Sequence, residues 1–211
     1  MSHSSSRALR LHRFERSGHC HRVQLLLSLL RLPYELIEVD LSAGAQRLPA
    51  FLVMNRFGLV PVLEDGELIL ADSNAILVYL AQKYGGHRWN PASPAAAAAV
   101  QRWLSVAAGP LATGPAAARA ALLFGVACDV QSARSRARDL FAVLDAELAE
   151  RPFLAGEAVS IADLAHYAYV AHAPEGGVSL APYPRIRGWL AAIEALPHFI
   201  PMRASPVVEA A

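Results

Sequence analysis

Four residues have the types and spacing to hold a zwitterionic ligand beside a peptide backbone. Val60-Pro61 opens an apolar strand, and an X-Pro bond there can be cis, which would expose the amide and carbonyl of Val60 to a ligand's backbone. Ser73 falls at a predicted helix start, where unpaired amides, the helix dipole and the hydroxyl favour a carboxylate. Asp72 beside it suits an ammonium group. The sequence therefore predicts a clamp for an amino-acid head group next to a peptide backbone.

The strands and helix that position this clamp follow one another closely. Asp65-Gly66 is a hairpin signal between the strand that opens at Val60-Pro61 and a returning strand over Glu67 to Leu70. A helix then runs from Asp72-Ser73 through Lys83. A strand, a tight turn, a second strand and a charged helix start in this order indicate a small-molecule site.

Upstream of the clamp, the pattern is that of a strand, a helix and a second strand. A unit of this length implies a right-handed crossover and a parallel pair. The summed order β-α-β-α-β-β-α is that of a thioredoxin-like domain. The expected elements are a strand over Leu9 to Phe14, a loop over Ser17 to His21, a helix over Arg22 to Leu30, a strand over Tyr34 to Leu41 and a helix over Pro49 to Met54.

Beyond this first domain the sequence changes to helical periodicity. Tyr84 to Pro94 holds two glycines and two prolines, which indicates a linker. Gly109-Pro110 and Gly114-Pro115 interrupt a helical composition and can shape a pocket wall. Ser160 to Asp163 is a capping-box pattern at a helix start. Further helices are expected over residues 95–106, 132–150 and 184–196.

Length and composition limit the fold and the partners. A chain of 211 residues allows two small domains with sizeable cores. There is no run of about 18 apolar residues and no apolar segment of signal-peptide length at the polar N-terminus, so we expect a cytoplasmic protein that does not bind membranes. A formal net charge of +1 leaves no electrostatic footprint for nucleic acid. Two cysteines, Cys20 and Cys128, make no disulfide framework.

The pattern resembles that of the cytosolic glutathione transferases, most closely in the run Asn55 to Ala75. The resemblance implies a serine-type, bacterial-like transferase that conjugates the thiolate of glutathione to small, mostly apolar electrophiles. Glutathione would be the co-substrate, no metal would be needed, and a homodimer is the usual assembly. The resemblance also implies a thioredoxin-like glutathione-binding domain over residues 7–84. An all-helical domain over 94–203 would contribute the second-substrate pocket.

The resemblance assigns roles to the clamp residues. Val60, before Pro61, would pair with the cysteinyl backbone of glutathione, and Asp72 with Ser73 would take its γ-glutamyl end. Ser17 lies between the first strand and the first helix, where the serine-type classes place the hydroxyl that activates the thiol.

An energetic estimate supports a serine in this role. A thiol with a pKa of about 8.5 is only roughly 3% ionised at pH 7, and lowering that pKa by about 2 requires about 2.7 kcal/mol. A hydroxyl that donates to the sulfur supplies about 1.5–3 kcal/mol, and the adjacent helix start adds about 0.3–1 kcal/mol. Ser17 can therefore ionise the thiol, although it can also serve only as a helix cap.

Two positions depart from the family pattern. Many members carry Gln or Lys where this chain has Leu59, and His or Lys in the loop before the short helix, where Gln46 is the nearest match. Loss of a charged contact costs about 1.5–3 kcal/mol, or roughly tenfold to a hundredfold in affinity. Weak glutathione binding, a modified thiol ligand or a non-catalytic binding protein with the same fold are therefore alternatives.

Cys20 offers a different chemistry. Ser17-x-x-Cys20 has the spacing of a redox C-x-x-C motif with its first cysteine replaced by serine, so a two-cysteine cycle is not available. A glutathione-dependent disulfide reductase that uses Cys20 is the alternative, provided that the thiol is exposed. We favour a Cys20 side chain that points inward as a small apolar group, and we interpret Cys128, in an apolar and helix-like run, as structural.

The histidines near the first helix give no metal prediction. Adjacent residues rarely turn their side chains to one centre, so His12, His19 and His21 with Cys20 are a poor ligand set. We interpret His19 and His21 as exposed loop imidazoles, although either could touch a substrate at the pocket mouth.

Overall fold

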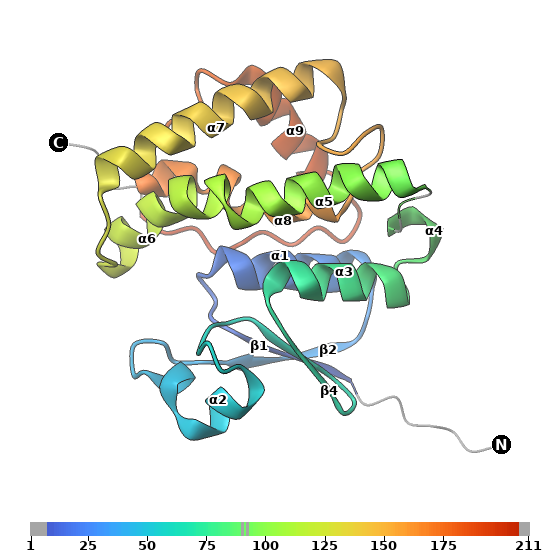
Figure 1. The fold of residues 1–211 in the computed structure, drawn as a ribbon, viewed down its shortest axis with the longest axis vertical. Coiled ribbons are helices and arrows are strands. Elements are labelled where there is room, and N and C mark those ends of the chain that lie inside the picture. Colours follow the sequence, from blue (N-terminus) through green and yellow to red (C-terminus); the bar gives the residue numbers. More distant parts are fainter. Residues whose placement is uncertain (1–7, 90, 92, 207–211) are drawn as a thin grey trace.

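A mixed sheet of four strands forms the N-terminal part of the chain (Figure 1). The computed structural model describes residues 8–89, 91 and 93–206. β1 and β2 run parallel, as expected for a strand-helix-strand unit, and β3 is antiparallel to both β1 and β4. The spatial order is β2-β1-β3-β4, with strands at Leu9–Arg13 (β1), Tyr34–Glu38 (β2), Val62–Asp65 (β3) and Leu68–Ala71 (β4).

Helices cover both faces of this sheet. α1 and α3 lie between the sheet and the C-terminal helices (Figure 1). α2 packs on the other face of the sheet. Successive side chains of β3 point to opposite faces, so Val62 shares a small apolar cluster with Phe51 of α2, whereas Leu63 belongs to the main core. The bounds are Gly18–Leu29 (α1), Pro49–Met54 (α2) and Ser73–Tyr84 (α3).

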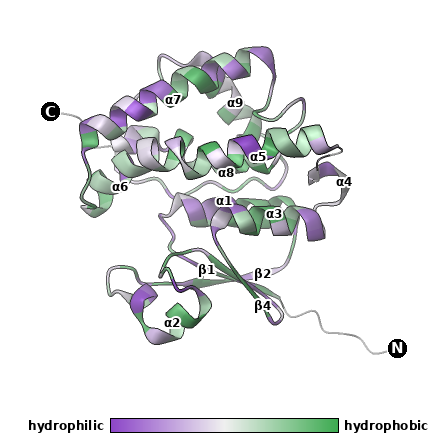
Figure 2. Cartoon of the chain, viewed as in Figure 1, coloured by the Kyte–Doolittle hydropathy of each residue, from purple (hydrophilic) through white to green (hydrophobic). Residues whose placement is uncertain are grey.

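The rest of the described chain consists of helices and loops, apart from one isolated bridge. α8 runs through the centre of these helices and is buried at every position from Ile161 to Val170. α7 carries both hydrophilic and hydrophobic positions, as a helix with one buried face does (Figure 2). The α-helices are Gly86–Trp89 (α4), Pro94–Ala108 (α5), Ala117–Phe124 (α6), Val130–Glu150 (α7), Ile161–Ala171 (α8) and Pro184–Glu194 (α9). Two 3-10 turns, Ala45–Arg47 (η1) and Ala173–Gly176 (η3), and a π-helical turn, Ala112–Ala116 (η2), complete the set.

The predicted capping box is present at the N-terminus of α8. The Asp163 carboxylate accepts hydrogen bonds from the backbone amides of Ser160 and Leu154 at 2.8 and 2.9 Å, and from Trp189 Nε1 at 2.9 Å. Burial raises the pKa of this carboxyl group. One buried side chain therefore ties two further segments to the start of α8.

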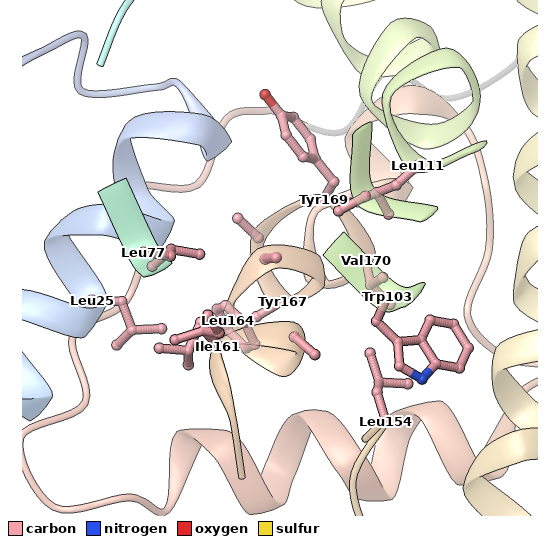
Figure 3. Close-up of a cluster of buried hydrophobic side chains, with 14 of the residues drawn as sticks. Leu25, Leu77, Trp103, Leu111, Leu154, Ile161, Leu164, Tyr167, Tyr169 and Val170 are labelled. Carbon is pink, nitrogen blue, oxygen red and sulfur yellow. The ribbon is translucent and has the colours of Figure 1, made fainter. Parts of the chain in front are cut away.

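α1 and α3 of the sheet domain pack directly against α8. Leu25 of α1 and Leu77 of α3 face Ile161 and Leu164 of α8 (Figure 3), and all four side chains are buried. The two parts of the molecule thus share one apolar core, which fixes the position of α1 relative to the C-terminal helices.

The start of α1 approaches α8 most closely at a glycine. A Cβ on Gly18 would lie 2.8 Å from Cζ of Tyr169, which is closer than any side chain tolerates. Gly18 is therefore required for the Tyr169 ring to lie against the first turn of α1, next to Ser17.

The predicted fold class is confirmed, but some element boundaries differ. α1 begins at Gly18 and not at Arg22, because Ser17 caps the helix by accepting a hydrogen bond from the Cys20 amide. The predicted linker contains the short helix α4. Gly114-Pro115 falls in the π-helical turn η2, so the chain bends there without leaving the helical conformation.

Two further expectations were wrong. Cys128 is exposed in the loop between α6 and α7, because Gly125 ends α6 with a φ of +67° and the apolar run after it is not helical. His19 and His21 are not exposed loop imidazoles, since both lie inside α1, where His21 is buried and His19 is half-buried. Nε2 of His21 donates to the carbonyl of Ile200 at 2.9 Å.

No helix in the described part of the chain has both the length and the apolar character needed to cross a bilayer.

The buried histidines predict a steep loss of stability in acid. Burial lowers the pKa of His166 and of His21 to about 4 and that of His19 to about 3. Unfolding returns each to a pKa of about 6.5, so the unfolded chain binds more protons and the free energy of unfolding falls as the pH drops from about 6.5 to about 4.

His166 provides the test of this prediction. Its Nδ1–H donates to the Ala162 carbonyl at 2.8 Å, a bond that a glutamine amide can make. In urea titrations across this pH range, His166→Gln should reduce the pH slope by about 1.4 kcal/mol per pH unit. An unchanged slope would contradict a neutral His166 in the folded protein.

Candidate active site

The predicted clamp residues line one cavity of about 320 Å³. We call it the clamp cavity. It lies where the loop before β3, the end of β4 and the first turns of α1 and α3 meet. Its lining residues are His19, Asn55, Phe57, Leu59, Val60, Pro61, Ala71, Asp72 and Ser73.

The backbone of Val60 is available in this cavity. The Val60-Pro61 peptide bond is cis, as the sequence suggested. Within the described residues the N–H and C=O of Val60 make no hydrogen bond. Because a buried or half-buried backbone group normally has a partner, Val60 offers a donor and an acceptor to an extended ligand.

Asn55 organises the loop before Val60, a role that the sequence argument missed. Its Nδ2 donates to the Leu59 carbonyl at 2.8 Å, and its Oδ1 accepts from the Phe57 amide at 3.1 Å. Its own carbonyl accepts from the Gly58 amide at 2.9 Å. An Asn in the loop five positions before Val60 is a typical turn signal that could have pointed to this role.

Asp72 is the N-cap of α3, a role that the sequence argument did not assign to it. Its Oδ1 accepts from the amides of Asn74 and Ala75, both at 2.9 Å, so those amides are not free to hold a ligand carboxylate. The φ of Asp72 is +73°, a conformation that is uncommon for residues other than glycine and often found at functional sites. The anion site therefore reduces to the amide and hydroxyl of Ser73, with the outer Asp72 oxygen open to an ammonium group.

Arg22 stands directly behind Ser73 and was also missed. It is buried, and its Nη1 donates to Ser73 Oγ at 3.2 Å and to Asn74 Oδ1 at 2.9 Å. Its Nε and Nη2 have no partner within the described residues. Burial lowers the pKa of Arg22 to about 10, so the guanidinium stays charged at neutral pH and places a cation behind the anion site.

His19 completes the back of the clamp cavity. Its Nδ1 lies 3.2 Å from Ser73 Oγ, and burial together with the charge of Arg22 keeps its imidazole neutral, with a pKa of about 3. Since a guanidinium can only donate, Ser73 Oγ accepts from Arg22. The hydroxyl proton of Ser73 is then left for His19 or for a bound carboxylate.

Ser17 lines a second cavity, of about 460 Å³. We call it the apolar cavity, because most of its wall consists of aliphatic and aromatic side chains. It lies between the β1–α1 loop, the loop after β2, and helices α6 and α8. Its lining residues are Phe14, Arg16, Ser17, Leu41, Ser42, Ala116, Arg119, Ala120, Phe124, Val126 and Tyr169.

Ser17 can cap α1 and activate a thiol at the same time. Its Oγ accepts from the Cys20 amide at 3.3 Å, and a hydroxyl has a separate proton to donate. Ser17 lines the apolar cavity, while His19, two residues further along α1, lines the clamp cavity. The start of α1 therefore contributes to the walls of both cavities.

Cys20 is not placed for thiol chemistry. Its side chain is 1% exposed, it lines neither cavity, and burial raises its pKa to about 11. Sulfur chemistry requires an accessible thiolate. The inward-pointing interpretation of Cys20 is confirmed, and the geometry argues against a reductase that uses it.

Of the two positions that depart from the family pattern, only Leu59 lines the clamp cavity. Leu59 lines the clamp cavity with 60% of its surface exposed. Gln46 lies in η1 and is not among the lining residues, although its Oε1 has no partner within the described chain. A contact from Gln46 to a ligand remains a prediction.

The described residues contain no group of three or more His, Cys, Asp or Glu arranged to hold a metal ion. His12 contacts Glu64 on the sheet, His19 contacts Ser73, and His21 contacts the Ile200 carbonyl. The three histidines therefore point to three separate partners.

The fold and its two cavities define a two-domain thioredoxin-like protein that can hold a peptide-like ligand next to an apolar one. The family model "Glutathione S-transferase, N-terminal domain" matches residues 11–88, and "Glutathione S-transferase, C-terminal domain" matches residues 93–197. The chain is 34% identical to Glutathione S-transferase 3 of Zea mays, over 90% of this chain and 91% of that protein.

Solved structures of glutathione transferases also resemble this chain over most of its length. A glutathione S-transferase from Pseudomonas fluorescens superposes with a TM-score of 0.88 at 34% identity, over 93% of this chain and 99% of that one. A glutathione transferase homolog from Drosophila mojavensis, solved with bound glutathione, superposes with a TM-score of 0.82 at 27% identity, over 90% and 89% of the two chains.

The chain belongs to the glutathione S-transferase family, and it is a transferase enzyme. The family uses glutathione as co-substrate.

Arg22 allows a test of the anion site. Arg22→Met keeps the side-chain length but removes the charge and the bond to Ser73, so we expect the Kd for glutathione to rise about tenfold. Cysteinylglycine, which lacks the γ-glutamyl head group, should lose little affinity. Calorimetry measures both ligands, and Arg56→Met, at an exposed position of the loop before β3, is the matched control. Equal losses for the two ligands would contradict a role at the head-group site.

Proposed function

We propose that the protein conjugates the thiolate of glutathione to small, mostly apolar electrophiles, with Ser17 as the residue that ionises the thiol. The observation that carries this proposal is the position of Ser17 in the wall of the apolar cavity, two residues before His19, which lines the clamp cavity. The proposal has the sulfur of a ligand in the clamp cavity reach toward the Ser17 hydroxyl.

The cysteinyl backbone and the γ-glutamyl head group of glutathione each have matching groups in the clamp cavity. Val60 offers an unpaired amide and carbonyl to the cysteinyl backbone. Ser73, with Arg22 behind it, suits the γ-glutamyl carboxylate, and Asp72 suits the ammonium group. Residues 7–84 would then bind glutathione, and residues 94–203 would contribute the second-substrate pocket.

The mechanism needs only positioning and one hydrogen bond. The Ser17 hydroxyl donates to the sulfur, the first turn of α1 adds its dipole, and the thiol proton leaves to solvent. The thiolate then attacks a carbon held in the apolar cavity. The exposed Leu59 takes the place of a polar contact, so we expect moderate affinity for glutathione.

Ser17→Ala tests the assigned role. Loss of the hydrogen bond should lower kcat/KM for conjugation of 1-chloro-2,4-dinitrobenzene by roughly tenfold to a hundredfold, and it should raise the apparent pKa of the bound thiol in a pH profile. Ser17→Thr keeps both a hydroxyl and a capping group, so it should retain most of the activity. An alanine variant with the wild-type rate and pH profile would contradict the proposal.

We also propose that the protein acts as a homodimer. An apolar groove of about 610 Å³ runs between α5 and α7. Val143 in this groove is 50% exposed, and Phe57 on the sheet domain is 79% exposed. Exposed apolar surface of this kind is typical of subunit contacts. A second copy of the chain, which carries the same apolar surfaces, is the occupant that we propose.

A charge in the groove tests the dimer. Val143→Arg should convert dimers to monomers in sedimentation-velocity experiments, because a long charged side chain would have to be desolvated and accommodated inside the apolar contact. Ala149→Arg changes an exposed position on another side of α7 and should leave the assembly unchanged. A wild-type chain that sediments as a monomer would contradict this proposal.

A further inference from the structure

Arg16 presents an unpaired guanidinium to the apolar cavity. It lies next to Ser17 in the loop between β1 and α1 and lines the cavity. Its Cζ is 5.1 Å from the ring centroid of Phe124 and 5.7 Å from that of Phe14, so the two aromatic walls hold the cation by cation–π contact. Within the described chain, no carboxylate lies within ion-pair distance of it.

The carboxylates that could neutralise this cation are bound elsewhere. Glu15 pairs with Arg203 at 2.8 Å. Glu175 pairs with Arg119 at 2.6 Å and also accepts from the Ser205 amide. Among the described residues that line the cavity there is no aspartate or glutamate.

The remaining ionisable wall residues do not add negative charge. Burial raises the pKa of Tyr169, so its phenol is neutral at physiological pH. Arg119 adds a second guanidinium to the wall. Its Nη1 donates to the Arg16 carbonyl at 2.8 Å, which fixes the backbone of Arg16, and its Nη2 has no partner within the described chain.

We propose that the apolar cavity selects electrophiles that carry a carboxylate on an aromatic or aliphatic body, and that Arg16 binds this carboxylate. The inference deepens the proposed function and rests on it. The apolar wall favours the body of the substrate, while the unpaired guanidinium favours an anionic end. Arg16 is thereby a specificity-determining residue, and Arg119 positions it.

A pair of chloronitrobenzenes isolates this contribution. 4-Chloro-3-nitrobenzoate carries the carboxylate, and 4-chloro-3-nitrobenzamide is its neutral counterpart of nearly the same shape. In both, the glutathione thiolate forms a C–S bond at the ring carbon that holds chlorine, the C–Cl bond breaks and chloride leaves with the electron pair. The proton of the thiol is released to the buffer.

The kinetic experiment compares KM for the two compounds in matched variants. The wild type should show a lower KM for the benzoate, and Arg16→Gln should raise the benzoate-to-benzamide KM ratio about tenfold. Arg16→Lys should restore most of the preference, because it restores the charge. Arg187→Gln makes the same charge change on an exposed position of α9 and should leave the ratio at its wild-type value. A KM ratio that is equal in the wild type and Arg16→Gln would overturn the inference and leave the conjugation proposal intact.

A binding titration separates this inference from the proposed function. Equilibrium dialysis of 4-chloro-3-nitrobenzoate without glutathione requires no turnover. The compound should bind the wild type about tenfold more tightly than Arg16→Gln. Equal binding to both variants would overturn the role of Arg16 even if neither compound were conjugated, whereas tighter wild-type binding without conjugation would support Arg16 and contradict only the transferase chemistry.

Discussion

The close packing of α1 against α8 is the constraint on which the site depends. Gly18 has no side chain, so the Tyr169 ring can lie against the first turn of α1, where an added Cβ would be 2.8 Å away. Ser17, next to this contact, lines the apolar cavity, which both domains build, and His19 lines the clamp cavity, which the sheet domain builds. The shared core of α1, α3 and α8 holds this arrangement (Figure 3).

The charges around the site are arranged to attract anions. Arg22 and Arg16 are each without a paired carboxylate within the described residues, and burial keeps His19 neutral. A guanidinium without a counter-ion in a half-buried or buried position is unfavourable unless a ligand supplies the charge. We therefore assign to the two arginines two different carboxylates, that of glutathione at Ser73, in front of Arg22, and that of a second substrate beside Ser17.

The sequence predicts interactions between neighbouring residues better than interactions between residues far apart in the chain. The cis Val60-Pro61 bond and the capping box at Ser160 depend on neighbouring residues, so the sequence indicates them directly. Arg22 acts on Ser73, 51 positions away, and Arg119 acts on Arg16, 103 positions away. No local pattern encodes such pairs. α1 begins at Gly18, before the predicted start at Arg22, because the capping bond of Ser17 extends the helix toward the N-terminus.

The most direct test of this account is a calorimetric titration with glutathione at pH 7 in buffers of different ionisation enthalpy. If Ser17 ionises the thiol that the clamp cavity holds, one glutathione binds per chain and binding releases protons, because a free thiol with a pKa of about 8.5 is mostly protonated at this pH. Ser17→Ala should bind glutathione with much smaller proton release. Binding without proton release in the wild type, or no binding at all, would contradict the central claim.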